Sequence, residues 1–496
     1  MVHRRQFLIA AVPAALDGFE HLTIGHGRVL SRHRDLPAFT APIGGGEVAV
    51  LLGWAWQIDE GAPSPAEQLA GPRMSRAQVA RVTASWNGRW ALLYGDELHL
   101  DACGMLGVYY SAQPGREALS SSCALLSEVM GFARNPDAPP LRHDAGINWY
   151  PGPATPLTGV RRLLVSEGLT FGETVAVWNR CVIDPAAYCA LSPDEIVDQV
   201  IGQLERLYRA YAADGYNLVL PLSAGRDSRT LLGPLLKSGV PFTAYTCITP
   251  KVSYADGHLP AKMAKELGFR HRVLRRCGQP DEEKLAEYDR HTFGCATGAD
   301  RKYYACGQYP AVERGMLLRG GLWELTSVYY KAMGKADSSD AGERMDAIRR
   351  HFPRSGNQPF MMDAMAEWLE HVGECAPALN WRDQMYYEQR GGCWLSAIEQ
   401  GMDMIDLVHI LPVNAAKTMS MLIGIGFDAR QAGWHQAEIM RRSAPALMRY
   451  SINRVYAFEK AFKVAQFIKR WGMRAAVGRA ANRLIRRPAG GAKAGT

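Results

Sequence analysis

Residues 217–232 read NLVLPLSAGRDSRTLL, and this stretch decides how the second half of the chain folds. An apolar run suited to a buried strand leads into a turn of small and polar residues and then into a helical pattern. The unpaired N–H groups and the dipole at the start of such a helix favour a bound anion. The stretch therefore predicts an anion-binding turn between a strand and a helix.

The side chains of this turn favour a phosphorylated ligand. Gly225 allows the backbone to approach a phosphate closely, and the hydroxyl groups of Ser223 and Ser228 can donate hydrogen bonds to it. Asp227 would repel a bare phosphate, so its presence predicts a Mg²⁺ ion that bridges the carboxylate and the phosphates. Arg226 and Arg229 are either extra cationic contacts to the ligand or helix-start salt bridges, and the sequence leaves both open.

The surrounding pattern alternates helix and strand, which is typical of a parallel sheet with crossover helices. Ser192, Pro193 and Glu195 form the start of a helix that ends near 214–215. After the turn we expect a helix over 229–239, a strand over 242–248, a helix over 258–268 and a strand over 271–275. From about 281 to 450 the periodicity is mainly helical.

The first 135 residues have a different pattern. Short alternating runs separated by Gly, Asp and Ser predict an antiparallel, hairpin-built β domain, with a tight turn at 94–98 and helices at 66–71 and 76–86. We interpret 118–129, ALSSSCALLSEV, as another of these runs. A Pro-rich passage over 135–158 reads as a linker or a first crossing between domains.

The turn SAGRDS resembles the SGGxDS pyrophosphate loop of ATP pyrophosphatases, specifically of asparagine synthetase-like enzymes, with Ala224 in place of one glycine. The resemblance continues in later segments, through Gly321 and Glu324 of LLRGGLWELTSVYY and through Pro412 and Asn414 of HILPVNAAKTMSM. It implies that the strand residues near Cys247 lie beside an adenine, and it matches a helix and strand through Asp256, Ala261, Ala264, 267–268 and His271.

The same resemblance covers the N-terminal part. GRWALLYGDELHLDACGMLGVYY is similar to a hairpin of the class II glutamine amidotransferase domain, and LSSSCALL to the strand after it. Active members use an N-terminal Cys, whereas this chain begins Met1-Val2-His3 and its first cysteine is Cys103. The resemblance therefore implies a domain that has lost glutamine hydrolysis.

The expected fold is α/β in two domains. We expect a degenerate glutamine amidotransferase-like domain with an Ntn-hydrolase-like αββα arrangement, and a parallel-sheet ATP-pyrophosphatase (PP-loop, adenine nucleotide alpha hydrolase-like) domain with a helical extension. The predicted boundaries are 1–135 for the first domain, 136–190 for a linker with interface strands, 191–485 for the ATP-binding domain and 486–496 for a disordered basic tail.

The resemblance implies an ATP- and Mg²⁺-dependent ligase that adenylates a carboxylate, releases pyrophosphate and forms an amide with an amine or ammonia. Gly320 stands where the family has a metal-binding acid, which leaves Asp227 as the predicted metal ligand. The expected nucleotide contacts are Ser223, Ala224, Gly225, Asp227, Ser228, Cys247 and Gly321. The expected catalytic residues are Glu324 with Tyr329 or Tyr330, Arg226, and a lysine among Lys417, Lys460 and Lys463.

Two alternatives stay open. Macrolactam cyclases of lasso peptide pathways resemble this architecture and act on a precursor peptide, and a nucleotide-binding pseudoenzyme is compatible with Ala224 and Gly320. Whichever holds, the predicted partners are a small or peptide carboxylate and an amine donor.

Composition narrows the setting to a cytoplasmic globular protein without a membrane span. Ten cysteines without a CxxC pair favour reduced thiols, and the short apolar run of 7–12 favours a first strand over an export signal. The excess of positive charge lies after residue 446, where the sequence contains twelve Lys and Arg residues and one acidic residue. We therefore expect no nucleic-acid partner, and this basic segment is either a solvated helix face or a contact for an acidic partner or phosphates.

Overall fold

The computed structural model describes residues 2–142, 146–248, 253–275, 279–372 and 379–452. The predicted basic segment and the tail at 486–496 lie outside these residues. Within them, no helix combines the length and the apolar character needed to cross a membrane.

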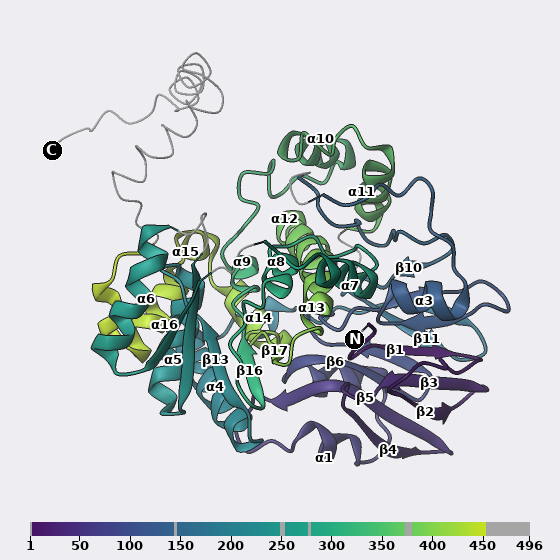
Figure 1. Cartoon of the computed structure of the whole chain (residues 1–496), viewed down its shortest axis with the longest axis horizontal. Coiled ribbons are helices and arrows are strands. Elements are labelled where there is room, and N and C mark those ends of the chain that lie inside the picture. Colours follow the sequence, from purple (N-terminus) through teal and green to yellow (C-terminus); the bar gives the residue numbers. More distant parts are fainter. Residues whose placement is uncertain (1, 143–145, 249–252, 276–278, 373–378, 453–496) are drawn as a thin grey trace.

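The N-terminal part is built from two six-stranded antiparallel sheets, at the lower right of Figure 1. Their strand orders are β10-β8-β9-β1-β3-β2 and β12-β11-β7-β6-β5-β4. The strands of the first sheet are β1 (Phe7–Ala10), β2 (Phe19–Ile24), β3 (Arg28–His33), β8 (Tyr109–Ser111), β9 (Ala118–Ser120) and β10 (Arg161–Arg162). Those of the second are β4 (Ala38–Gly44), β5 (Glu47–Gln57), β6 (Trp86–Tyr94), β7 (Glu97–Leu100), β11 (Glu167–Phe171) and β12 (Val175–Asn179).

Successive side chains of β5 point to opposite faces of its sheet, which explains how the two sheets and their helices form layers. Val50 and Leu52 join the large core shared with the first sheet, whereas Ala49 and Leu51 pack under helices α1 (Pro65–Leu69) and α2 (Arg76–Thr83). On the other side, helix α3 (Cys123–Met130) lies against β9 and β1. Helices thus cover both outer sides of the paired sheets, and the predicted turn at 94–98 is the two-residue connection from β6 to β7.

One predicted run is wrong in its second half. Residues 118–129 begin as strand β9 but become α3 after Ser122, whose hydroxyl accepts hydrogen bonds from the N–H groups of Ala124 and Leu125. Gly131 closes this helix in the left-handed conformation, with φ 67°. A local cap therefore overrides the apolar alternation.

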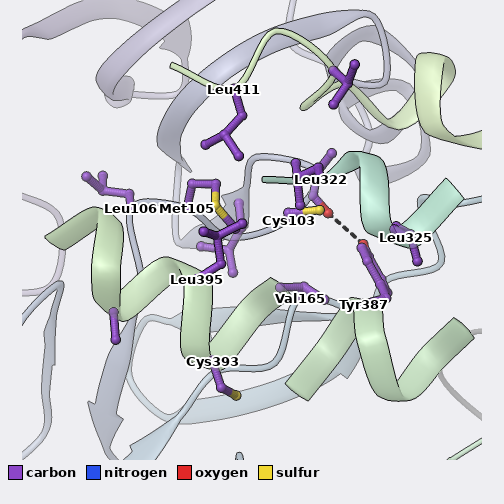
Figure 2. Close-up of a cluster of buried hydrophobic side chains, with 14 of the residues drawn as sticks. Cys103, Met105, Leu106, Val165, Leu322, Leu325, Tyr387, Cys393, Leu395 and Leu411 are labelled. Atoms are coloured by element: carbon purple, nitrogen blue, oxygen red, sulfur yellow. Dashed lines mark hydrogen bonds between the residues drawn. The ribbon is translucent and has the colours of Figure 1, made fainter. Parts of the chain in front are cut away.

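The chain between the two expected domains also contributes strands. β10 pairs with β8, and β11 pairs with β7, so the short strands expected at the interface extend both N-terminal sheets. Cys103, Met105 and Leu106, which follow β7, pack in a buried cluster with Leu322 and Leu325 from the second half of the chain (Figure 2). In the same view the Tyr387 hydroxyl donates to the Ala102 carbonyl at 2.6 Å.

The C-terminal part holds a five-stranded parallel sheet in the order β15-β14-β13-β16-β17. Its strands are β13 (Asn217–Pro221), β14 (Phe242–Ile248), β15 (Arg270–Arg275), β16 (Gly315–Leu318) and β17 (Val408–Ile410). The four strand pairings of this sheet are all parallel, which confirms the α/β class. The chain builds outward from β13 to β15 and then returns to the other side of β13 with β16, so the strand order reverses between β13 and β16.

Helices cover both faces of this sheet (Figure 1). Leu218 and Leu220 of β13 belong to the core that includes α4 and α5, whereas Val219 belongs to a separate cluster with Ile398 and Met402 of α13. The first helices are α4 (Pro193–Ala213), α5 (Arg226–Ser238), α6 (Tyr254–Leu267), α7 (Glu282–Thr292), α8 (Asp300–Ala305) and α9 (Trp323–Thr326). The later ones are α10 (Ala341–His351), α11 (Pro359–His371), α12 (Trp381–Gln384), α13 (Ser396–Met402), α14 (Ala416–Gly424), α15 (Phe427–Ala432) and α16 (Trp434–Ser443).

The described part of the chain also contains two 3₁₀-helices, η1 (Pro185–Tyr188) and η3 (Pro445–Arg449), and the π-helix η2 (Met385–Leu395). The predicted capping box at the start of α4 is confirmed, because Ser192 and Glu195 exchange side-chain and backbone hydrogen bonds. η2 is a π-helical stretch, and such stretches are frequent at functional sites.

A buried network of charged side chains joins the two halves. Arg89 of β6 forms a two-pronged ion pair with Asp403, at 2.5 and 2.8 Å, and both side chains are 1% exposed. His409 of β17 contacts Asp403 and also Glu399, and Glu399 pairs with Arg319 at 2.8 Å. The guanidinium groups hold the pKa values of Asp403 and Glu399 below their usual range, despite burial that acts in the opposite direction. The network runs from the N-terminal sheet to the residue directly before Gly320.

Removing one member of this network should be costly. Asp403→Ala leaves the Arg89 guanidinium buried without its carboxylate, and we expect a loss of about 3–5 kcal/mol in the free energy of unfolding, measured with denaturant. The control is Arg441→Ala, which breaks an exposed pair with Glu438 and should cost less than about 1 kcal/mol. Equal losses in the two variants would contradict this account.

Candidate functional site

The predicted turn lies at the point where the strand order of the parallel sheet reverses. The turn follows β13 and enters α5, while the segment with Gly320 and Gly321 follows β16, the neighbouring strand. A Cβ atom added to Gly320 would lie 3.4 Å from the Cβ of Asp227, so the two segments touch. Ligands of open parallel sheets bind at such reversal points, beyond the carboxyl ends of the strands.

The turn is held by its own hydroxyl groups. The Ser223 hydroxyl accepts a hydrogen bond from the Gly225 N–H at 3.0 Å and lies 3.2 Å from the Ser228 hydroxyl, which accepts from the Ser223 N–H. The Ala224 N–H donates to a carboxylate oxygen of Asp256 at 2.7 Å. α5 itself starts at Gly225 without a side-chain cap. The N–H groups of its first turn are therefore the donors that a ligand can reach most directly.

Asp227 is a half-buried acid without a cationic partner. Its carboxylate accepts a hydrogen bond from the side-chain amide of Gln436 at 2.7 Å. Burial raises its pKa above the usual range, and this hydrogen bond and the nearby Arg226 offset only part of the shift. The described residues therefore offset the negative charge of the Asp227 carboxylate only in part.

The two arginines of the turn behave differently. Arg229 is fully buried and donates to four carbonyl groups, those of Ala224 and Gly225 in the turn and those of Tyr450 and Ser451. This arrangement makes Arg229 a brace for the turn, held by carbonyl groups rather than by a salt bridge to any described residue, and its contact with a ligand stays a prediction. Arg226 donates to the Ala432 carbonyl at 3.1 Å, and its catalytic role stays a prediction.

Glu324 lies on the segment that faces the turn. Its carboxylate is 2.9 Å from the Tyr386 hydroxyl, which is also 2.8 Å from the Gly321 carbonyl oxygen. Burial is the largest cause of a raised pKa at Glu324, and the charge of Asp227 adds to it. The Tyr386 hydroxyl has one proton and can donate to one acceptor at a time. When Glu324 is neutral, its carboxyl group can donate to the Tyr386 oxygen, and the hydroxyl proton is then free to go to the Gly321 carbonyl. The pair can therefore hold or accept a proton.

An arginine that the sequence did not single out lies beside this pair. The Arg390 guanidinium stacks over Trp394 at 3.6 Å and lies 5.7 Å from the ring centre of Tyr329 and 5.9 Å from that of Trp149. Within the described part of the chain no carboxylate pairs with it, and its buried Nε atom has no hydrogen-bond partner. Its charge is close enough to lower the pKa of Glu324. Only a three-dimensional arrangement reveals it, because the residues come from three separate segments.

The remaining predicted residues occupy different places. Tyr329 is 44% exposed and packs edge-on against Tyr386 at 5.4 Å, so the phenol that contacts Glu324 is Tyr386. The Cys247 thiol, at the carboxyl end of β14, donates to the Gln308 carbonyl at 3.4 Å. Lys417 pairs with Asp59 of the N-terminal part at 2.8 Å. Lys460 and Lys463 lie outside the described residues.

The side chains of Asn414 and Cys103 are buried and contact other parts of the protein. Asn414 donates to the Gly88 carbonyl and to Asp101, and its own carbonyl accepts from the Cys103 N–H, so it fastens the two halves together. Cys103 is fully buried, and burial raises the pKa of its thiol well above the usual value. A thiol in this state is a poor nucleophile.

The described residues contain no group of three or more His, Cys, Asp and Glu side chains that could hold a metal ion by themselves. Mg²⁺ is commonly bound through one or two carboxylates together with the phosphates of its substrate. A single half-buried Asp227 at a helix start fits that mode, with the phosphates completing the site. The glycine at position 320 leaves Asp227 without a second acid there.

Asp227→Asn should stabilise the protein at neutral pH. Folding raises the pKa of the Asp227 carboxyl group, so the native state is less stable when this group is ionised. The wild type therefore loses stability as pH rises through the raised pKa, whereas the amide variant does not. We expect a gain of about 1 kcal/mol at pH 8 that shrinks toward zero near pH 4, measured by denaturant unfolding. A variant that is less stable at both pH values would show that Asp227 serves the fold.

Comparisons with known proteins add little to this geometry. No protein-family model and no curated protein matches the chain. A solved structure described as NMN synthetase from Francisella tularensis is similar to it with 15% identity and a TM-score of 0.19, over 48% of this chain and 96% of that chain.

Proposed function

We propose that this protein is an ATP-dependent ligase that adenylates a carboxylate, releases pyrophosphate and joins the acyl group to an amine or ammonia. Its proposed site is the region beyond the carboxyl ends of β13 and β16. The observation that carries the proposal is the uncapped start of α5 at the reversal of the strand order, with two serine hydroxyls and an incompletely compensated carboxylate beside it.

In this proposal the first turn of α5 binds the diphosphate that leaves. Ser223 and Ser228 can rotate their hydroxyls from each other toward phosphate oxygens, since each now contacts the other at 3.2 Å. Asp227 would hold a Mg²⁺ ion together with the phosphates, and that ion would neutralise their charge as pyrophosphate leaves. The substrate carboxylate oxygen attacks the α-phosphorus, and the bond to the bridging oxygen of pyrophosphate breaks.

The second step uses the side of the site that faces Glu324. The amine nitrogen attacks the carbonyl carbon of the acyl-adenylate, AMP leaves, and the amine loses one proton. The Glu324–Tyr386 pair is placed to accept that proton, because the carboxylate is half-buried and its pKa is raised. Arg390, which lacks an acidic partner among the described residues, is placed to bind an anionic group of the substrate.

The N-terminal domain has a supporting role in this proposal. Cys103 is buried, and His3 donates through its backbone N–H to His291 of α7 and contacts Glu128 through its ring. In this proposal the ligase takes its amine directly rather than from glutamine, because the thiol of Cys103 is buried and poorly nucleophilic. A precursor peptide that is closed on itself by the same two steps remains an alternative substrate.

One observation favours a second candidate, a nucleotide-binding protein without turnover. The carboxylate of Asp256 occupies the Ala224 N–H, which a phosphate oxygen would otherwise use. An acid at this place opposes phosphate binding unless Mg²⁺ or a cation compensates it. Catalytic exchange therefore decides between the two candidates.

The exchange of labelled pyrophosphate into ATP measures adenylation directly. We expect wild-type protein with Mg²⁺ and a panel of carboxylates, including amino acids and peptides with Asp or Glu, to catalyse exchange. Asp227→Asn should lower it about 100-fold or more, because the metal loses the carboxylate proposed to hold it.

Asp428→Asn, on the exposed start of α15, is the matched control and should keep full activity. Exchange by neither wild type nor control would favour the candidate without turnover. Full exchange by Asp227→Asn would place the chemistry at another site.

Glu324→Gln should separate the two steps. The amide side chain keeps its contact with Tyr386 but cannot accept the proton of the amine, so we expect pyrophosphate exchange to persist while amide formation falls about 100-fold. The measurement is amide product by mass spectrometry beside the exchange rate. Parallel loss of both activities would mean that Glu324 acts before adenylation.

A further inference from the structure

A cavity of about 960 Å³ lies between the end of α7, the helix α8, residues 134–141 and Tyr150. Its walls come from both halves of the molecule, and the proposed ligase steps use none of its side chains. Its volume is in the range of cavities that hold drug-sized organic ligands.

The walls of this cavity are largely apolar. Phe293, which ends α7 in the left-handed conformation with φ 53°, forms one side with Ala296. Leu141 and Tyr150 come from the N-terminal half, and the Tyr150 hydroxyl already donates to the Pro139 carbonyl. Such walls favour the apolar body of a ligand.

The charges around the cavity are predominantly positive. Its single acid, Asp289, is occupied by Arg301, which donates to both carboxylate oxygens at 2.6 and 2.5 Å. Arg134, Arg290 and Lys302 are exposed and have no ion pair with any residue that the structure describes. Three uncompensated cations beside apolar walls attract an anion.

Two polar groups at the cavity, the guanidinium of Arg134 and the side-chain amide of Gln308, could contact a ligand. The Arg134 guanidinium lies 4.5 Å from the centre of the Phe293 ring and donates to the Phe293 carbonyl at 3.2 Å, which fixes a cation over the wall. Gln308, another lining residue, is only 3% exposed, and its side-chain nitrogen has no hydrogen-bond partner. A buried donor without an acceptor destabilises the protein, and a ligand oxygen would supply the missing acceptor.

We propose that this cavity binds an organic anion with an apolar or aromatic body. The body packs between Phe293 and Leu141, and the anionic group pairs with Arg290 and Lys302 at the rim. An acceptor atom of the ligand reaches the buried side-chain amide of Gln308. The backbone carbonyl of the same residue accepts from the Cys247 thiol at the end of β14. The site does not depend on ligase activity and stands if that activity is absent.

The test uses two fluorescent probes that share an aromatic body. 1-Anilinonaphthalene-8-sulfonate carries an anionic group, whereas N-phenyl-1-naphthylamine is its neutral analogue. We expect the sulfonate to bind wild-type protein at one site, and the double variant Arg290→Glu/Lys302→Glu to weaken that binding about tenfold or more while the neutral probe is unaffected. Both positions are exposed, so the thermal unfolding midpoint should stay close to that of the wild type.

The matched control is Lys262→Glu/Lys265→Glu on α6, which changes the net charge by the same amount at residues that do not line the cavity. It should leave the affinity for the sulfonate unchanged. Equal weakening in both double variants, no binding to the wild type, or the same affinity for both probes would each overturn the proposal. Because no ATP or carboxylate substrate is present, the result is separate from the exchange assay.

Discussion

The buried charge network from Arg89 to Arg319 is the constraint on which the rest of the structure depends. Charged groups removed from water must find partners, and here the partners come from β6, from α13 and its C-cap Asp403, from β17 and from the residue after β16. One arrangement of these elements therefore satisfies them together. Arg319 directly precedes the segment that touches Asp227. The N-terminal sheets therefore help to position the candidate site although their residues take no part in the proposed chemistry.

Much of the fold could be predicted from local signals. The stretch 217–232, the capping box of α4 and the β6–β7 turn are each specified by a few neighbouring residues. The strand, helix and turn that they predict are confirmed. The stretch 118–129 was misjudged because Ser122 competes with apolar alternation, and a single hydroxyl cap decides the outcome. The order of the parallel strands was not predicted, because pairing between distant segments leaves no local trace.

The candidate site divides in the same way. Asp227, Ser223 and Ser228 could be found because one short turn carries them. Tyr386 and Arg390 could not, because they come from η2, about sixty residues after Glu324, and become relevant only when the aromatic rings and the carboxylate meet. Both half-buried acids have raised pKa values, and Arg390 lacks an acid among the described residues. These opposite charges, held near one another without neutralising each other, are what a site for phosphates, metal and carboxylate requires.

A structure with bound α,β-methylene-ATP and Mg²⁺ tests the central claim most directly. The account predicts the β- and γ-phosphates within hydrogen-bond distance of the first N–H groups of α5 and the metal ion on Asp227, with the Ser223–Ser228 contact opened. A nucleotide bound elsewhere, or phosphates kept away from α5 while Asp256 still holds the Ala224 N–H, would contradict it.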